Sequence, residues 1–420
     1  MIPSVEVYVS KAGCSAPAEC DMHIGTCRFN LRRGAVSTSF SYSSAYLESP
    51  NAFAIDPALP LRSTSAHCDG LPGALRDSAP DRWGRHLIDR RALVEASEQH
   101  CRPRTFDEVD YLLGVYDASR QGALRFALPE SREFLSPRET IPPLIELKRL
   151  IAASNHVSRS DEGKEQVKEL LDAGSGSLGG ARPKASVVDE GKLLLAKFSH
   201  PGDVWDVMAW EKTSLDIARL AGIVVPNSRL VRLGKSSALL LERFDREGSL
   251  VGGERVPYLS AMSLVGAGDG SQNDYVDVAE ALVDWCESPN VELEELFKRV
   301  ALSIALHNTD DHLRNLGFVR LGGRWQVSPV FDVNINPDSG RQRATAVYGE
   351  AGDGEASGLK ELAVVCGLGR ATTADAVASV VSAARQWSTC ARRNGCKESE
   401  MTVMGRVIEE RCDALDAAFV

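Results

Sequence analysis

The segment 307–318 constrains the fold of this chain more than any other, because it places acidic and polar residues directly after an apolar stretch of helical spacing, 291–306. It reads His-Asn-Thr-Asp-Asp-His-Leu-Arg-Asn-Leu-Gly-Phe and contains Asp310 and, five residues later, Asn315. A Leu-Gly-Gly-Arg turn then separates two short apolar runs, which predicts a β-hairpin. Asp332 follows that hairpin. The sequence therefore predicts a helix, an acidic loop, a hairpin and a second aspartate, in this order.

This order is the one in which protein kinases arrange a catalytic Asp, a metal-binding Asn and a further Asp. Phosphoryl transfer asks a protein mainly to position the acceptor hydroxyl and to hold Mg²⁺ with hard oxygen ligands. Asp310, Asn315 and Asp332 reproduce the order and the spacing. The alternative for the loop alone is a solvated turn with capping carboxylates. This alternative becomes less favoured if the chain contains further kinase elements in the order in which kinases have them.

A glycine-rich stretch in the middle of the chain is the first such element. Residues 173–180 read Ala-Gly-Ser-Gly-Ser-Leu-Gly-Gly, and the backbone N–H groups of such a loop can approach phosphates without obstruction by Cβ atoms. The apolar runs 185–188 and 192–198 flank Asp-Glu-Gly, which predicts a β-hairpin after the loop. A flexible linker is the alternative for the glycines taken alone.

A lysine and a glutamate after this loop are candidates for an ion pair. Lys197 closes the second apolar run, where a buried ammonium is costly unless it meets a phosphate or a carboxylate. The alternative is an edge lysine that reaches solvent. Glu211, on a helix predicted over 206–221, is its candidate partner, and an exposed helix glutamate is the alternative there. Lys184 is a further candidate for phosphate contact.

The run 239–246, Leu-Leu-Leu-Glu-Arg-Phe-Asp-Arg, ends an apolar strand just before the chain becomes mainly helical. A kinase hinge meets adenine at such a place, and the backbone groups of Glu242 and Phe244 would make that contact. An ordinary strand that ends in a charged turn is the alternative.

The rest of the chain changes from sheet-rich to helical. Alternating residues over 5–9 predict a strand, and 27–31 is a second candidate. Asp81 is placed to cap a helix that carries Trp83 and further apolar residues. The glycine-rich stretch 349–358 is predicted to be a loop.

Composition excludes several other classes. A chain of 420 residues with 43% hydrophobic residues can form more than one packed unit, and a net charge of −10 argues against binding nucleic acid through its own overall field. The ten cysteines are scattered, and the first residues lack a secretory signal, so we expect reduced thiols and a cytoplasmic protein. No window approaches the length of a membrane span. Cys14, Cys20, His23 and Cys27 lack a C-x-x-C pair, which argues against zinc.

At this point the chain resembles the HipA family of serine/threonine kinase toxins. The run 177–184, Ser-Leu-Gly-Gly-Ala-Arg-Pro-Lys, looks like its glycine loop, and 242–246, Glu-Arg-Phe-Asp-Arg, looks like its hinge. The run 310–315, Asp-Asp-His-Leu-Arg-Asn, matches its D-x-H-x-x-N loop, and 77–85 looks like the element that closes its N-terminal subdomain. Asp332 is followed by Val333 rather than Phe-Gly, as in other HipA-like sequences.

The resemblance implies an α+β, two-lobed protein-kinase-like fold with an all-helical C-terminal lobe. The predicted domains are a HipA-like N-terminal subdomain at 1–125, an ATP-binding lobe at 126–250 and a helical lobe at 251–420. It also implies ATP and Mg²⁺ as cofactors, a protein substrate such as an aminoacyl-tRNA synthetase, and a small helix-turn-helix antitoxin that resembles HipB. DNA would be met only through that antitoxin, and no membrane contact is expected.

The resemblance further implies a role for each candidate residue. Asp310 would be the general base or the residue that orients the hydroxyl, Asn315 and Asp332 the metal ligands, and Ser177 the site of inhibitory autophosphorylation. The residues expected to contact ATP are Ser177, Leu178, Gly179, Gly180, Ala181, Lys184, Lys197, Glu242 and Phe244. A small-molecule kinase and an inactive kinase-fold corepressor subunit are the alternatives, because motifs alone do not identify the acceptor.

Overall fold

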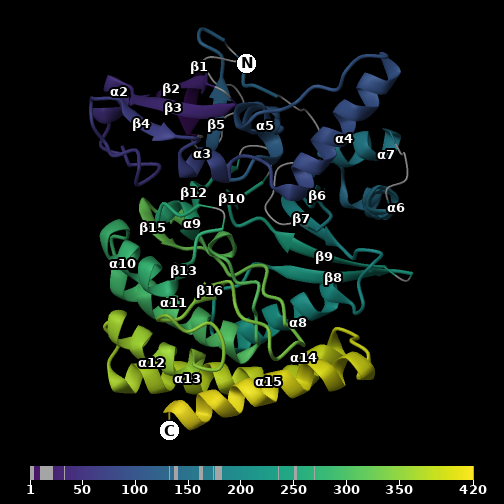
Figure 1. Ribbon diagram of the computed structural model, residues 1–420, viewed down its shortest axis with the longest axis vertical. Helices are drawn as coiled ribbons and strands as arrows, with labels where there is room; N and C mark the ends of the chain where they lie inside the picture. Colours follow the sequence, from purple (N-terminus) through teal and green to yellow (C-terminus); the bar gives the residue numbers. More distant parts are fainter. Residues whose placement is uncertain are drawn as a thin grey trace. The chain divides into compact units, whose positions relative to one another are not determined.

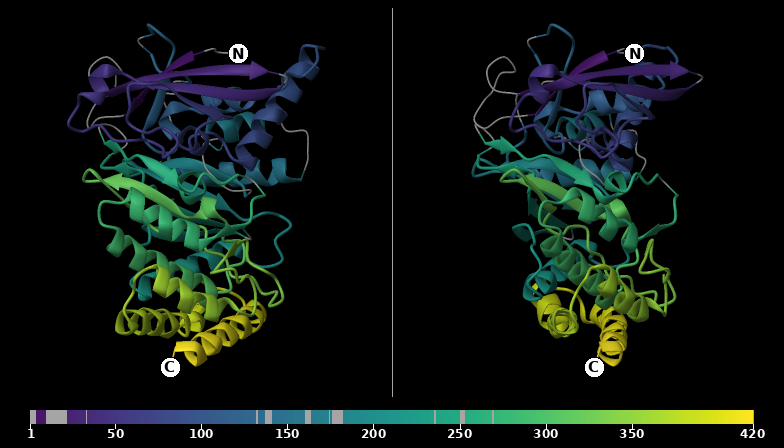
Figure 2. Two further views of the ribbon diagram at one scale, coloured as in Figure 1. Left: turned by 60° about the vertical axis from the view of Figure 1, so that its left-hand side comes forward. Right: turned by 90° about the vertical axis from the view of Figure 1, so that its left-hand side faces the viewer.

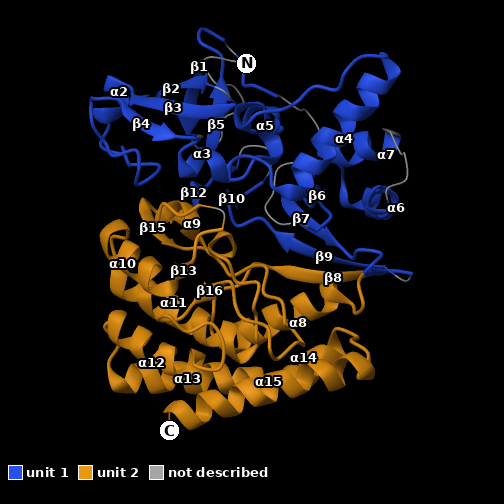
Figure 3. Cartoon of the chain, viewed as in Figure 1, with its two compact units in different colours: residues 1–202, 232–259 blue, residues 203–231, 260–420 orange. Residues whose placement is uncertain are grey.

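The computed structural model describes residues 4–9, 22–32, 34–131, 133–136, 141–159, 164–173, 175, 182–234, 236–249, 253–268 and 270–419 (Figure 1). The chain forms two compact units, coloured separately in Figure 3. Unit 1 comprises Met1–Gly202 and Arg232–Leu259, and unit 2 comprises Asp203–Val231 and Ser260–Val420. The division of the sequence near residues 125 and 250 remains a prediction. Within the described ranges, no helix is long and apolar enough to cross a bilayer.

Unit 1 begins with a five-stranded sheet of order β4-β3-β2-β1-β5. Its strands are β1 (Ser4–Val9), β2 (Met22–Arg32), β3 (Ala35–Tyr42), β4 (Ala66–Asp69) and β5 (Leu124–Ala127), all antiparallel to their neighbours. Val5, Val7 and Val9 are buried while the residues between them are partly exposed, so the predicted alternation is confirmed. The short helices of this region are α2 (Ser44–Leu47), α3 (Gly73–Asp77), α5 (Glu108–Gly114) and η1 (Asp117–Ser119).

Unit 1 also contains a group of packed helices. They are α4 (Arg82–Glu98), η2 (Leu144–Glu146), α6 (Leu147–Ser158) and α7 (Lys164–Asp172). The side chain of Asp81 accepts a hydrogen bond from the Gly84 N–H at 2.9 Å, which confirms the predicted helix cap. Trp83 packs in a core shared by α4, α6 and α7, and Leu170 on α7 is fully buried there. Burial of this apolar face stabilises helices that would be marginal alone.

The predicted hairpin between residues 185 and 198 is confirmed. It consists of β6 (Lys184–Asp189) and β7 (Lys192–Phe198), and β7 pairs with β9 (Ser236–Glu242) on its other side. Glu190 and Gly191 both have positive φ, 49° and 78°, as a two-residue turn that matches the strand twist requires. The other short strands are β8 (Ser228–Leu233) and β12 (Tyr258–Ser260), which contain unit boundaries, with β10 (Arg246–Glu247) and β11 (Glu254–Arg255) in unit 1.

Unit 2 is mainly helical. Its helices are α8 (Val207–Leu220), α9 (Ala261–Leu264), α10 (Tyr275–Trp285), α11 (Pro289–Ala305), η3 (Leu313–Asn315), α12 (Glu355–Val365), α13 (Arg370–Ala384), α14 (Trp387–Arg393) and α15 (Glu398–Phe419). Figure 2 shows the last of these helices, in yellow, lying against one another, and α13 contacts both α11 and α15. The predicted hairpin after the acidic loop is present as β14 (Gly317–Leu321) and β15 (Arg324–Val327), and β13 (Asn273–Asp274) pairs with β16 (Thr345–Ala346).

One prediction for unit 2 is wrong in part. The glycine-rich stretch 349–358 was expected to be a loop, but α12 begins at Glu355 within it. The reason is packing, because a Cβ on Gly358 would lie 2.0 Å from the carbonyl oxygen of Val347. Gly358 therefore lets a backbone segment approach the helix closely, which a sequence pattern of glycines does not distinguish from a loop.

Candidate active site in unit 2

The acidic loop leaves α11 through a tight C-terminal motif. The N–H of His307 bonds to the Ile304 carbonyl at 2.9 Å, and the N–H of Asn308 bonds to the Ser303 carbonyl at 2.8 Å. This is the Schellman pattern, which usually has glycine at the position of His307. His307 adopts φ 47° there, and its ring nitrogen Nε2 bonds to the Asp338 carbonyl at 2.9 Å. The side chain thus supplies a contact that glycine would lack, at a residue in a costly backbone conformation.

Asp310 and Asn315 are linked by a hydrogen bond across the loop. The Asn315 side-chain amide Nδ2 donates to the Asp310 backbone carbonyl at 3.0 Å. The side-chain nitrogen of Asn315 is thus used within the loop. Its side-chain oxygen, Oδ1, can accept a hydrogen bond from another group or bind a cation. The Asp310 side chain is 79% exposed, and the His312 ring nitrogen lies 3.5 Å from its carboxylate.

Asp332 has a left-handed backbone conformation. It follows the β14–β15 hairpin, whose Gly322 and Gly323 have φ 57° and 80°, and it adopts φ 59° itself. A non-glycine residue in this conformation carries strain of the kind found at functional sites. The Asn334 side-chain nitrogen lies 3.4 Å from both the carbonyl and the Oδ1 of Asp332.

The pKa of Asp310 is raised above its ordinary value. Desolvation contributes first, the charges of Asp332 and Asp311 raise the pKa further, and those of His312 and Arg341 oppose the rise. Clustered carboxylates that repel one another favour a bound cation. Within unit 2, Asn315 is hydrogen-bonded to Asp310, and the charge of Asp332 acts on the Asp310 carboxylate.

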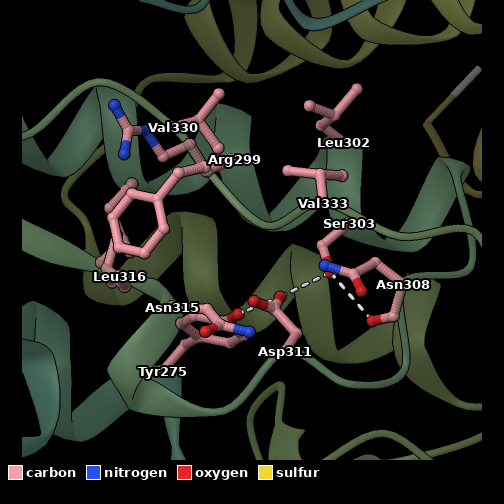
Figure 4. Close-up of a pocket in the computed structure, with 12 residues that line it drawn as sticks. Tyr275, Arg299, Leu302, Ser303, Asn308, Asp311, Asn315, Leu316, Val330 and Val333 are labelled. Carbon is pink, nitrogen blue, oxygen red and sulfur yellow. Dashed lines mark hydrogen bonds between the residues drawn. The ribbon is translucent and has the colours of Figure 1, made fainter. Parts of the chain in front are cut away.

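Two cavities adjoin these residues. One, of about 30 Å³, is lined by Asp311, Asn315, Ser303 and Asn308 together with apolar side chains, and Figure 4 shows Asp311 hydrogen-bonded to Ser303 beside it. The other has a volume of about 590 Å³ and is lined by Asp310, Thr309, Arg341 and neighbouring residues. A cavity of that size takes a small molecule or a few residues of a peptide.

The predicted lysines of unit 1 are both buried. Lys184 is 1% exposed and Lys197 is 5% exposed, and the two face each other across the β6–β7 pair. The Lys184 ammonium forms an ion pair with Asp81 at 2.8 Å, and the Ser175 hydroxyl donates a hydrogen bond to the Lys184 carbonyl. The alternative of an edge lysine that reaches solvent does not describe Lys197. Ser177, Leu178, Gly179, Gly180 and Ala181 lie outside the described residues.

The predicted hinge begins at Glu242, the last residue of β9. Glu242 forms an ion pair with Lys192 at 2.8 Å, and the Phe244 ring lies 6.2 Å from that of Tyr258. The N–H of Arg243 bonds to the Leu193 carbonyl at 3.0 Å, so β7 fixes this segment of backbone.

Glu211 is fully buried on α8, which rules out the alternative of an exposed helix glutamate. It belongs to unit 2 and Lys197 to unit 1. Their ion pair remains a prediction.

The structure also shows a charged cluster in unit 1 that sequence reasoning missed. The Asp245 carboxylate, 2% exposed, pairs with Arg243 and, at 3.0 Å, with Arg246, and it accepts the N–H of Gly122 at 2.7 Å. Asp117 pairs nearby with two further arginines. The charged run Arg-Phe-Asp-Arg at 243–246 indicated that ionic contacts form here, but its partner Gly122 lies more than 120 residues away along the chain. This cluster joins the segment after the hinge to the segment around β5.

An α+β fold with an acidic loop and a β-hairpin after a helix of a mainly helical unit is typical of kinase-like proteins. The family model for the HipA-like C-terminal domain matches residues 176–388, and the model for the HipA N-terminal domain matches residues 21–115. Since the first of these covers half of the chain, the chain belongs to the HipA family.

Solved structures and a curated relative complete the comparison. HipA of Shewanella oneidensis, solved with HipB and operator DNA, is 17% identical with a TM-score of 0.68 and 99% coverage of both chains. The predicted two-lobed, protein-kinase-like α+β fold is thereby confirmed. The Helicobacter pylori kinase CtkA matches 58% of this chain and 92% of its own at 16% identity, with a TM-score of 0.45. A Haemophilus influenzae protein with a provisional kinase name is 25% identical over 140 residues, and the match spans 41% of its length and 30% of this chain.

Proposed function

We propose that this chain is an ATP- and Mg²⁺-dependent serine/threonine protein kinase of the HipA type. The observation that carries the proposal is the grouping of Asp310, Asn315 and Asp332 in unit 2, where Asn315 bonds to the Asp310 carbonyl and the Asp332 charge acts on the Asp310 carboxylate. In this proposal Asp310 accepts or orients the proton of the acceptor hydroxyl, which an exposed carboxylate with a raised pKa can do.

The chemistry of Asn315 and Asp332 fits a magnesium ion. Both offer hard oxygen atoms, and the Asn315 nitrogen is already used by the loop, which leaves its oxygen as a ligand. Among the described residues no three His, Cys, Asp or Glu side chains form a metal cage. Mg²⁺ in phosphotransferases is commonly held by one or two side chains and completed by substrate phosphates. Bound Mg-ATP would supply the phosphoryl group and neutralise its charge.

We assign ATP contacts in unit 1 to the residues that resemble the family's loop and hinge. Lys197 and Lys184 would face the phosphates, and the burial of both lysines on paired strands suits an anionic ligand. Ser177, Leu178, Gly179, Gly180 and Ala181 would cradle the phosphates. The backbone of Glu242 and Phe244 would meet adenine, and Glu211 would pair with Lys197.

The biological setting is proposed from family membership. HipA of Shewanella oneidensis was solved with HipB and operator DNA. We propose a small helix-turn-helix, HipB-like antitoxin as the partner of this chain, with DNA contacted through it. The substrate would be a translation component such as an aminoacyl-tRNA synthetase, and the chain would act as the toxin of the pair.

Incubation of the purified chain with γ-labelled ATP, Mg²⁺ and bacterial lysate tests the activity. A labelled protein band that depends on the chain and is lost in Asp310→Asn supports the protein kinase. A labelled metabolite in its place supports a small-molecule kinase, and no transfer at all supports an inactive corepressor subunit. Either of the last two results refutes the proposal.

Autophosphorylation at Ser177 is proposed as the means of self-inhibition. A dianion in a loop that binds phosphates would repel ATP. After prolonged incubation with ATP, the wild-type chain is expected to lose activity while Ser177→Ala keeps it. Equal activity of the two proteins at the end of that incubation would contradict this role.

A further inference from the structure

We propose that Asp311 is the positioning residue of the acidic loop: it ties the loop to Tyr275, Ser303 and Arg343 so that the adjacent Asp310 is held toward the acceptor. This inference rests on the proposed kinase function, since it concerns the placement of the group that acts on the acceptor. Neither the sequence pattern nor the family comparisons assign a role to Asp311.

Several donors converge on the Asp311 carboxylate within unit 2. Its Oδ2 accepts the Ser303 hydroxyl at 2.5 Å, the Arg343 guanidinium at 3.1 Å and the Tyr275 hydroxyl. Its backbone carbonyl also accepts the Thr345 hydroxyl at 2.6 Å. Ser303 lies on α11, Tyr275 on α10 and Thr345 in β16, so separate elements meet at one residue of the loop. Figure 4 shows the Ser303–Asp311 bond and the proximity of Tyr275 to Asp311.

The charge of Asp311 is balanced inside the protein. The Arg343 side chain is 1% exposed and the Asp311 side chain 14%. Arg343 also lies 3.7 Å from the buried carboxylate of Glu355, and its Nη2 donates to the Ser303 hydroxyl at 2.7 Å. A buried carboxylate with this many donors is held far more rigidly than an exposed one. An asparagine at position 311 would place an amide N–H among groups that are themselves donors.

Adjacent residues of the loop thus face opposite environments. Asp311 is anchored inside, while the Asp310 side chain is 79% exposed. The loop is fixed on the preceding side as well, because Thr309 accepts the Ala344 N–H at 2.9 Å and the Asn336 amide at 2.6 Å. With both neighbours fixed, the backbone of Asp310 has little freedom. A displacement of about 1 Å in a reacting group can cost about 100-fold in rate, so this anchoring has a catalytic consequence.

The test compares turnover and KM for ATP in single and double variants of the full chain. Tyr275→Phe removes only the hydroxyl that donates to Asp311, and Tyr348→Phe, at a tyrosine that is 49% exposed, is the matched control. We expect kcat to fall about 10-fold in Tyr275→Phe and about 100-fold in Asp311→Asn, with KM for ATP changed by less than about 3-fold. The control is expected to behave as the wild type. A rise in KM for ATP in Tyr275→Phe and Asp311→Asn, with kcat unchanged, would overturn the proposal.

A double-mutant cycle separates positioning through Asp311 from a general loss of structure. If Tyr275 acts through the Asp311 carboxylate, adding Tyr275→Phe to Asp311→Asn lowers kcat no further. Full additivity of the two losses would overturn the proposal. Should Asp311→Asn fail to fold, Ser303→Ala, which removes another donor to the Asp311 carboxylate, takes its place beside Tyr275→Phe and is likewise expected to lower kcat with little change in KM for ATP.

Hydrogen exchange keeps this proposal distinct from the proposed function. Peptides that cover residues 307–316 are expected to exchange at least about 10-fold faster in Asp311→Asn and Tyr275→Phe, while peptides of α13 keep their protection. This readout needs no activity. A wild-type chain without phosphotransfer would refute the kinase function, whereas unchanged exchange of the loop in both variants would refute the anchoring.

Discussion

Replacement of Asp117 by asparagine is expected to destabilise unit 1 strongly at neutral pH and little in acid. The Asp117 carboxylate is 8% exposed and pairs with Arg125 at 2.7 Å and with Arg255 at 2.8 Å. Desolvation acts to raise its pKa, but Arg255, Arg125 and Arg120 outweigh this and lower the pKa from 3.8 to about 2. The carboxylate therefore stabilises the folded state when it is charged.

The magnitude follows from that difference in pKa. The step from 3.8 to about 2 corresponds to a folding free energy on the order of 2 kcal/mol. Because the folded pKa is the lower one, this stability is present above the unfolded pKa of 3.8 and is lost as the pH falls through about 2. At neutral pH Asp117→Asn also leaves the arginines facing one another, so its cost is expected to reach about 3 to 5 kcal/mol.

Urea unfolding followed by circular dichroism, at pH 7 and at pH values approaching 2, measures the effect. Asp375→Asn is the matched control, since Asp375 is exposed on α13 and its substitution is expected to change stability by less than about 0.5 kcal/mol. The difference in free energy of unfolding between the wild type and Asp117→Asn should become smaller as the pH is lowered toward 2. An equal difference at both ends of the pH range, or none at pH 7, would refute the reasoning.

Two further predictions concern packing and a buried charge. Gly358→Ala is expected to lower stability by about 1 to 3 kcal/mol in thermal unfolding, because the new Cβ meets the Val347 carbonyl, whereas Gly352→Ala has open space and should change it little. Lys184→Met leaves a buried carboxylate without its ion-pair partner and is expected to cost about 3 to 5 kcal/mol, against less than about 1 kcal/mol for Lys192→Met at a half-exposed pair. Equal melting temperatures within either pair of variants would contradict the corresponding prediction.

Local patterns predicted the elements that local physics determines. The cap at Asp81, the turn at Glu190 and Gly191 and the apolar helix before the acidic loop all depend on residues within a few positions of one another. The order of Asp310 and Asp332 was likewise readable because both lie in one short stretch of chain.

Contacts between distant segments could not be predicted in the same way. Asp311 meets Tyr275 across 36 residues, and Lys184 meets Asp81 across 103. Nothing in the run 310–315 distinguishes an aspartate that faces solvent from one that faces inward. The difference arises only when α10, α11 and the segment near Arg343 pack around the loop.

The most direct test of the central claim is to measure Mg-ATP binding and phosphotransfer side by side in the wild type, Asp310→Asn and the control Asp375→Asn. We expect Asp310→Asn to lower turnover by about 10² to 10⁴ while its Kd for ATP changes by less than a few-fold, and the control to match the wild type. Full turnover in Asp310→Asn would contradict the assignment of unit 2 as the phosphotransfer site.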